Sequence, residues 1–303
     1  MKQRTLANTV ETVGVGLHSG KRVLLKMKPA LANTGIIYKR VDLVPNVEIK
    51  LDANRVQDTM LCTALVDNDG NTISTIEHLN AALFAMGIDN AIIEVDADEI
   101  PIMDGSASPF IYLIKSAGIR ELSNKKKFLK IKKTIEVKDG DKWIKLSPFN
   151  GFKIDITTDF DHPELGVQNV TLDFSTKNFI DKLSRARTLG FMRDFEYLRS
   201  QNKCLGGGLD CAIVLDDYKV INEEGFRFDN EVVKHKALDA IGDLFVCGFN
   251  VLGELKAYKP GHGLNNLLVR ELLSNNESYE IITLTTDEEK QIKFLNDANL
   301  AFA

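Results

Sequence analysis

The sequence has little of what marks several protein classes. Among its 303 residues are only four cysteines, which form no C-x-x-C pair and no dense disulfide framework. We therefore expect free thiols in a reducing compartment. The formal net charge of -5 argues against nucleic acid as the main partner. It leaves room for an anionic small substrate, which a few local lysine and arginine residues can bind.

The chain also lacks long hydrophobic runs. No stretch approaches the ~18 consecutive apolar residues that a transmembrane helix needs. The segment after Met1 is polar and alternating, without the apolar centre of a signal peptide. These features predict a cytoplasmic protein with at most peripheral membrane contact. The composition, with 44% hydrophobic and 27% charged residues, is typical of a folded chain of about two domains.

Hydrophobic periodicity predicts the same order of elements in each half of the chain: strands, helix, strand, helix. The first helix begins near Ile76 and stops at Gly87, a common helix terminator. Further helices are predicted at Pro109–Ala117, Asn230–Cys247 and Leu264–Leu273. We therefore predict an α+β fold with a first domain over 1–124 and a second over 125–303.

Two segments of the second domain stand out. Six lysines crowd positions 125–133, where a strand is predicted at Phe128–Val137. A solvated linker explains this run, and attraction to anionic lipid headgroups is the alternative. An extra segment, 176–217, contains three consecutive glycines, Gly206–Gly208. They suit a sharp turn or a close approach of backbone to a ligand, or else an ordinary flexible loop.

Histidine is scarce, with five in the chain, so the surroundings of each can be weighed. His235, Asp239 and Asp243 are spaced four residues apart on the predicted long helix and share one face. Imidazole nitrogen and carboxylate oxygen are ligands that suit zinc or iron. A surface His–Asp pair is the other interpretation of this spacing. His18, in a glycine-rich turn, and His162, before a proline, are interpreted as structural or surface residues from spacing alone.

A second candidate is Glu77-His78, at the start of the first helix. His78 would supply a metal ligand, and Glu77, about 100° round the helix, would face a water in an open metal position. Alternatively, Ser74-x-x-Glu77 forms a capping box at the helix start. His262 lies between two glycines on a predicted tight turn. There it is either a general acid or a turn residue without a role in chemistry.

Taken together, these residues predict a three-ligand metal site of His78, His235 and Asp239 with an open fourth position for water. The sequence has no H-E-x-x-H motif, which excludes the common metalloprotease pattern. Structural zinc sites are usually closed and rich in cysteine. Three nitrogen and oxygen ligands with an open position therefore indicate hydrolysis.

Several longer motifs extend this interpretation. They are Ser74–Leu83, Ile100–Ser106, Ser184–Thr188, Gly190–Asp194, His235–Asp243 and Gly261-His262. In this order, over nearly the whole chain, they resemble the bacterial UDP-3-O-acyl-N-acetylglucosamine deacetylase family. The resemblance implies two similar sheet-plus-helix domains packed with helices between the sheets, and one catalytic zinc, or Fe²⁺, at the domain interface. It also implies a monomer that hydrolyses the acetamide of UDP-3-O-((R)-3-hydroxyacyl)-N-acetylglucosamine, an early step of lipid A synthesis.

The resemblance implies roles for single residues as well. His78, His235 and Asp239 match the zinc ligands, and Glu77 matches the general base. His262 matches the general acid, Asp243 the residue that orients it, and Thr188 a hydroxyl that helps to hold the oxyanion. The positions that match substrate-binding residues are Lys236, Phe191, Met192, Cys204, Gly207, Val214, Phe160, Asp159, Lys142 and His18.

The segment 176–217 resembles an insert that forms a hydrophobic passage for the acyl chain. Its candidate lining residues are Met192, Phe195, Cys204, Ala212 and Val214. Leu189 and Gly208-Leu209 depart from the family pattern, which bears on the width of the passage. Two alternatives remain: a zinc amidohydrolase that acts on another N-acylated sugar, and a non-catalytic binding module stabilised by zinc.

Overall fold

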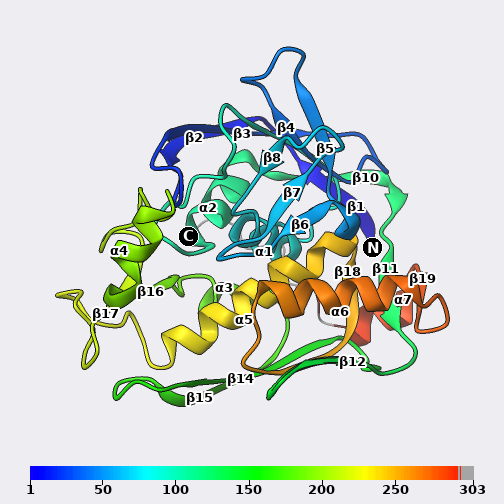
Figure 1. Ribbon diagram of the computed structural model, residues 1–303. Helices are drawn as coiled ribbons and strands as arrows, with labels where there is room; N and C mark the ends of the chain where they lie inside the picture. Colours follow the sequence, from blue (N-terminus) through cyan, green and yellow to red (C-terminus); the bar gives the residue numbers. More distant parts are fainter. Residues whose placement is uncertain (293, 295–303) are drawn as a thin grey trace.

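The computed structural model describes residues 1–292 and 294, and it has a mixed α+β fold. Sheets form the upper and lower parts of the molecule in Figure 1, and helices lie between them. Among these helices are α1 (Glu77–Met86), α5 (Glu231–Leu244) and α6 (His262–Ser274). The predicted α+β class is confirmed. The division at 124/125 stays a prediction, and residues 293 and 295–303 of its second domain lie outside the described residues.

The first half is built on a five-stranded sheet in the order β2-β3-β9-β4-β5. Its inner strands alternate between buried and more exposed residues, as expected when one face of a sheet packs on helices. The strands are β2 (Val10–Val15), β3 (Arg22–Pro29), β4 (Ile36–Arg40), β5 (Val47–Lys50) and β9 (Ala91–Val95). The turn η1 (Ala53–Arg55) and a small sheet of β6 (Val56–Asp58), β7 (Ala64–Val66) and β8 (Thr72–Ile73) lead into α1, and α2 (Ser108–Ala117) follows β9.

The second half has a seven-stranded sheet around β18 (Asn250–Tyr258), which pairs antiparallel with β13 and parallel with β11 and β14. The other strands are β11 (Phe128–Ile131), β12 (Ile135–Asp139), β13 (Lys142–Ser147), β14 (Phe152–Phe160), β15 (Gly166–Asp173) and β19 (Tyr279–Ile282). The single strand predicted at Phe128–Val137 is therefore wrong. The chain breaks at three exposed residues after Ile131, because β11 lies inside the sheet whereas β12 begins a hairpin with β13.

The remaining elements are short. A separate ribbon pairs β1 (Lys2–Leu6) with β10 (Ile119–Lys125). The segment 176–217 holds α3 (Thr176–Lys182), β16 (Leu189–Phe191), α4 (Met192–Ser200) and β17 (Ile213–Leu215). The turn η2 (Phe245–Cys247) extends α5, and α7 (Thr286–Gln291) follows β19. None of the described helices is both long enough and apolar enough to cross a membrane.

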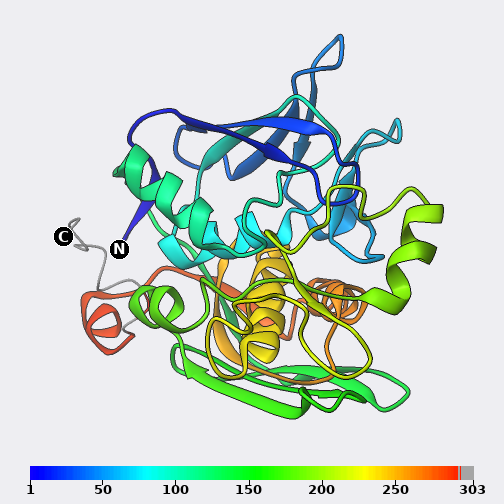
Figure 2. The same ribbon diagram turned by 90° about the vertical axis from the view of Figure 1, so that its left-hand side faces the viewer.

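The two halves share one core. Figure 2 shows α1 and α5 stacked between the sheets. The ring of Phe84, in α1, lies 5.4 Å from that of Phe152 in β14 and 5.8 Å from that of Phe245 in η2, measured between centroids in edge-on geometry. Lys126 is also buried where the halves meet, so the solvated linker predicted for the lysine run is wrong at this residue. This shared packing fixes α1 against α5, which is where the site lies.

Candidate active site and metal centre

The candidate site forms where helix α1 crosses helix α5. The two backbones meet at Gly242, where an added Cβ would lie 1.9 Å from the carbonyl oxygen of Glu77. Only glycine permits this approach, because any side chain would push the helices apart. The contact brings the first residues of α1 against the buried face of α5 that carries His235 and Asp239.

Three side chains converge at this crossing. His78 Nε2 lies 3.4 Å from Asp239 Oδ1, and His235 Nε2 lies 3.2 Å from the same oxygen. One ligand atom from each residue lies within 4.8 Å of the others, and all three residues are buried. The predicted ligands from two distant parts of the sequence are therefore together in space.

The hydrogen bonds at these residues fit a bound cation. His235 Nδ1 lies 2.9 Å from the carbonyl oxygen of Ala186, so this nitrogen carries the proton and Nε2 has a lone pair. That lone pair faces Asp239 Oδ1, which has no hydrogen-bond donor among the described residues. Burial lowers the pKa of His235 to about 3, so the imidazole is neutral. Two acceptors that face each other in a buried site repel unless a cation lies between them.

Lys236 adds a positive charge at the edge of the same site. Its Nζ lies 3.1 Å from Asp239 Oδ2. Burial opposes the charge of Asp239, but nearby positive charge, including that of Lys236, outweighs it and holds the pKa of this carboxyl well below its usual range. Asp239 is therefore an anion with one oxygen bound to an ammonium and the other free for a metal.

A second buried cluster adjoins the ligands. Glu77 Oε2 accepts a hydrogen bond of 2.9 Å from the backbone N–H of Thr63, and the Thr63 hydroxyl donates to Asp243 Oδ1 at 2.6 Å. Asp243 Oδ2 lies 2.9 Å from His262 Nδ1 and accepts a 2.8 Å bond from Asn265 Nδ2. Thr63 and Asn265 were missed by the sequence reasoning, because no local motif marks a residue that acts only through its neighbours in space.

Two sequence-based alternatives are corrected here. The capping box at Ser74 is not formed: Ile76 is the N-cap residue of α1 without a side-chain cap, and Glu77 turns to Thr63 instead. His262 is not on an isolated tight turn. It is the first residue of α6, after Gly261 as N-cap residue.

The surroundings of Glu77 and His262 shift the pKa values of both side chains. Burial raises the pKa of Glu77, and the nearby His262 and His78 only partly offset this. Burial disfavours the imidazolium of His262, yet the Asp243 carboxylate outweighs it and raises the pKa to about 9. A carboxylate with a raised pKa beside a charged imidazole is a pair suited to general base and general acid chemistry.

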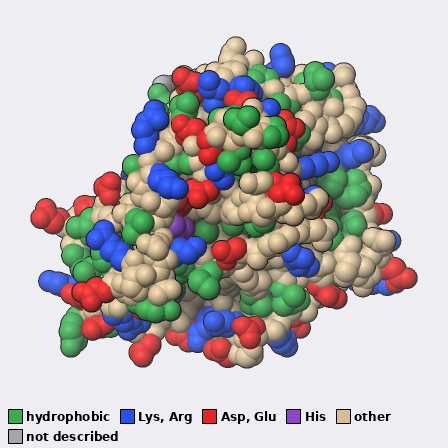
Figure 3. Space-filling model, turned by 45° about the horizontal axis from the view of Figure 1, so that its top comes forward, with side chains coloured by type: hydrophobic (Ala, Val, Ile, Leu, Met, Phe, Trp, Pro, Cys, Tyr) green, Lys and Arg blue, Asp and Glu red, His purple; other side chains and the backbone are tan. Residues whose placement is uncertain are grey.

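Two connected cavities open from this cluster. A smaller one of about 160 Å³ is lined by Glu77, His78, His235, Asp239 and His262 among others. A larger one of about 570 Å³ has mainly apolar walls from β16, α4 and the loop after it. The residues that line both are Leu17, Leu61, Thr188, Leu189 and Lys236. Figure 3 shows a histidine in a hollow on one face of the molecule.

Known proteins resemble this chain over almost its full length. The family model described as UDP-3-O-acyl N-acetylglycosamine deacetylase matches residues 3–274. The chain belongs to this deacetylase family. A relative from Photobacterium profundum, named UDP-3-O-acyl-N-acetylglucosamine deacetylase, is 62% identical over 95% of each chain. Relatives of the same name from Aliivibrio fischeri and Vibrio cholerae are 59% and 58% identical over 97% of each chain. The family resemblance inferred from the sequence motifs is thereby confirmed.

In this member of the deacetylase family, most residues matched to substrate binding line the larger cavity. They are His18, Phe160, Phe191, Met192, Cys204, Gly207, Val214 and Lys236, and Phe195 and Ala212 join them. Asp159 and Lys142 are not among the lining residues. Asp159 instead accepts a hydrogen bond from the Tyr258 hydroxyl at 2.7 Å, and Lys142 is exposed at the start of β13.

The glycine run brings the insert against the first half. Gly206 and Leu205 donate backbone hydrogen bonds to the carbonyl oxygens of Leu17 and His18. A Cβ at Gly206 would lie 2.3 Å from the carbonyl oxygen of Gly16. The run therefore serves a close approach between two backbones, rather than the flexible loop that was one interpretation.

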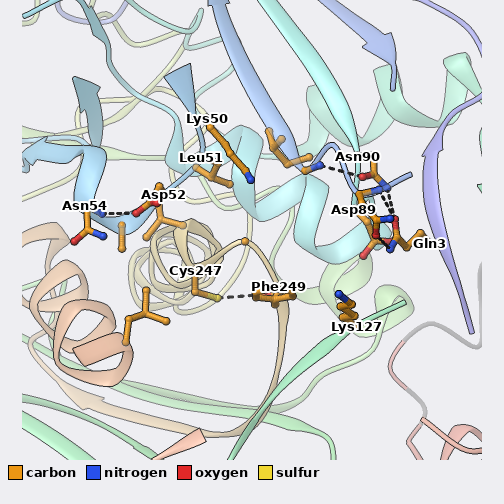
Figure 4. A pocket seen from close by; sticks show the side chains of 17 residues that line it. Gln3, Lys50, Leu51, Asp52, Asn54, Asp89, Asn90, Lys127, Cys247 and Phe249 are labelled. Atoms are coloured by element: carbon orange, nitrogen blue, oxygen red, sulfur yellow. Dashed lines mark hydrogen bonds between the residues drawn. The ribbon is translucent and has the colours of Figure 1, made fainter. Parts of the chain in front are cut away.

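A third cavity, of about 350 Å³, lies apart from this site (Figure 4). Its labelled wall residues include Lys50 and Asn54 from the first half and Lys127, Cys247 and Phe249 from the second. It contains none of the residues assigned above to metal or to chemistry.

Proposed function

We propose that this chain hydrolyses the acetamide of UDP-3-O-((R)-3-hydroxyacyl)-N-acetylglucosamine, which gives the free 2-amine and acetate in lipid A synthesis. One observation carries the proposal: two imidazoles and a carboxylate converge beside Glu77 and His262, at the inner end of a large apolar cavity. Hydrolysis explains the polar cluster, and a lipid-bearing substrate explains the cavity. We also propose that the enzyme is cytoplasmic and monomeric.

The residues present fit a single divalent cation, zinc or Fe²⁺, held by His78, His235 and Asp239 at the interface between the halves. When bound, such a cation supplies Lewis acidity, which lowers the pKa of water towards neutrality and polarises a carbonyl oxygen. The carbonyl of Ala186 fixes the tautomer of His235 that such binding requires.

Glu77 is the general base of the proposed reaction. It is held by the Thr63 N–H through one oxygen, which leaves the other oxygen to take a proton from the attacking water. Its raised pKa suits this role, because a base that titrates closer to neutrality accepts the proton more readily. Thr188 lines both cavities, so its hydroxyl can donate to the oxyanion that develops on the acetamide carbonyl. Such a donor is often worth ~3 kcal/mol.

His262 delivers a proton to the departing amine. Asp243 holds it through Nδ1 at 2.9 Å, which keeps the ring charged and leaves Nε2 for the substrate. Lys236 lines the same space as Thr188 and offers a fixed positive charge to the anionic part of the substrate. The walls of Phe191, Met192 and Val214 then receive the acyl chain.

The test is mass-spectrometric detection of acetate released from the UDP-acyl-sugar, with chelated protein as control. We expect release that stops on chelation and returns when zinc is added. A matched substrate without the 3-O-acyl chain should react far more slowly, because it leaves the apolar cavity empty. Equal rates on the two substrates would favour an amidohydrolase for another N-acylated sugar. A metal-loaded protein that releases no acetate, and unfolds on chelation, would favour a binding module.

A further inference from the structure

A buried ion pair lies next to the candidate site. The side chains of Arg187 and Glu231 are at most 1% exposed. Glu231 accepts three hydrogen bonds from Arg187, through its backbone N–H and guanidinium, and a fourth from the backbone N–H of Arg227. The rest of the guanidinium donates to Glu224 Oε1 at 2.7 Å and to the carbonyl oxygen of Gly225 at 2.8 Å. Protein partners therefore bind four of the five guanidinium N–H groups and both carboxylate oxygens of this pair.

The pair joins two segments that carry site residues. Glu231 is the first residue of α5, one helical turn before the metal-ligand candidate His235. Arg187 lies between Ala186, whose carbonyl oxygen meets His235 Nδ1 at 2.9 Å, and Thr188, which lines both cavities. Three consecutive residues thus face the imidazole, the start of its helix and the reaction space.

We propose that the Arg187–Glu231 pair is a positioning clamp, which locks residues 186–188 onto the start of α5 so that His235 keeps one tautomer and the Thr188 hydroxyl stays in register with it. The proposal rests on the proposed function for the roles of His235 and Thr188. Arg187 and Glu231 are positioning residues, because they act through Ala186 and Thr188 rather than on the substrate.

Stability alone does not account for this pair. Buried ion pairs are often replaceable by apolar residues of similar volume without loss of stability, because desolvation offsets their attraction. Such a replacement removes the directional hydrogen bonds between the two segments. The guanidinium binds one carboxylate through several fixed N–H groups, which sets the distance and angle between the two segments. Backbone bonds anchor the far side: Thr188 N–H donates to the carbonyl of Gly105, and Thr188 accepts from Ile213 N–H.

The first test compares Glu231→Gln with Glu224→Gln. Glu224 holds the same guanidinium from its exposed side, with 59% of its side chain accessible, and so serves as a matched control. Imidazole ¹⁵N NMR of the metal-free protein reads the tautomer directly, and the chain has only five histidines. In Glu231→Gln we expect His235 to lose its single Nδ1–H tautomer and zinc affinity to fall about tenfold. We also expect kcat to fall with KM unchanged, and Glu224→Gln to match the parent in every measurement.

The second test is the double variant Arg187→Met with Glu231→Leu, which keeps the volume of the pair and removes its direction. We expect a thermal transition close to that of the parent, but the same loss of tautomer and zinc affinity as in Glu231→Gln. A double variant that keeps both would show that the pair only fills space, and would overturn the proposal. Neither readout needs turnover. A parent protein that binds zinc with His235 in one tautomer, yet releases no acetate, would sink the proposed function and leave the clamp standing.

Discussion

The two ends of helix α1 bury charge in opposite ways. At the C-terminal end, Lys126 Nζ donates to the carbonyl oxygen of Gly87 at 3.2 Å and to Asp89 Oδ1 at 2.5 Å. The other oxygen of Asp89 accepts a 2.7 Å bond from the backbone N–H of Arg4. At the N-terminal end, Glu77 and His78 are also buried, yet Asp239 Oδ1, which lies 3.4 Å from His78 Nε2, has no hydrogen-bond donor among the described residues.

The difference separates structure from chemistry. A buried charge with all its partners provided by the protein holds the fold together, and here it also agrees with the dipole of α1, whose C-terminal end attracts an ammonium. A buried acceptor that is left open is costly, and a protein keeps it only where something else binds. We call the N-terminal end of α1, at Glu77 and His78, the open end, and its C-terminal end, at Gly87, the closed end. The open end faces Asp239 and His262, whereas the closed end faces the ribbon of β1 and β10.

The sharpest test of the comparison is Glu77→Gln. The amide keeps an oxygen for the Thr63 N–H but cannot take a proton, so we expect kcat to fall by about 10³-fold. Metal content should stay near that of the parent. The melting temperature should stay level or rise, because burial already disfavours this carboxylate. The measurements are steady-state turnover, elemental analysis and calorimetry. If the variant is inactive only because it has lost its metal, the role given to Glu77 is wrong.

The reverse pattern is expected at the closed end. Lys126→Ala leaves Asp89 without its ammonium, which should lower the free energy of unfolding by about 3 kcal/mol in urea titrations. Turnover per folded molecule should not change, since Lys126 touches neither cavity of the site. Lys127→Ala is the matched control, because Lys127 is the exposed neighbour and its loss should change stability by less than about 0.5 kcal/mol. Equal stabilities of the two variants would contradict the distinction between the two ends.

The sequence predicted the residues of the open end but not how they meet. The spacing of His235, Asp239 and Asp243 placed them on one helical face, and Glu77-His78 opened a helix, because both patterns are local. Their convergence depends on Gly242, where α1 packs against α5. In the sequence this residue is an ordinary glycine within a helix, and only the tertiary structure shows why glycine is needed. Thr63 and Asn265 hold Asp243 from elements far apart in the chain, and no pattern within either element marks them.

The burial of Lys126 at the closed end was not predicted, for a related reason. A run of lysines is normally solvated, and nothing within positions 125–133 distinguishes Lys126 from its neighbours. Its burial follows from Asp89, which tertiary packing brings to it. The break between β11 and β12 was not predicted for the same reason. Ile135 and Val137 keep the parity of Leu129 and Ile131 across the polar residues 132–134, and only the pairing of β11 with β18 and β19 shows that the strand has ended.

The most gradual expected effect is a pH dependence of stability that is confined to the open end. Asp243 raises the pKa of His262 from 6.5 to about 9 against the effect of burial. The folded protein therefore binds this proton more tightly than the unfolded chain. The resulting stabilisation is complete below pH 6.5 and is lost as the pH rises through about 9. One such group lowers the free energy of unfolding by at most ~1.4 kcal/mol per pH unit in that range.

Urea titrations of the chelated protein between these pH values measure this slope. His262→Gln should flatten it, because the amide cannot carry the proton that Asp243 stabilises. His162→Gln is the control: His162 binds the carbonyl oxygen of Asp216 rather than a buried carboxylate, so its loss should leave the slope in place. Parallel curves for the parent and His262→Gln would mean that the ring is neutral in the folded protein. The open end would then hold no titrating charge in this range, and the proton for the departing amine would have to come from another group.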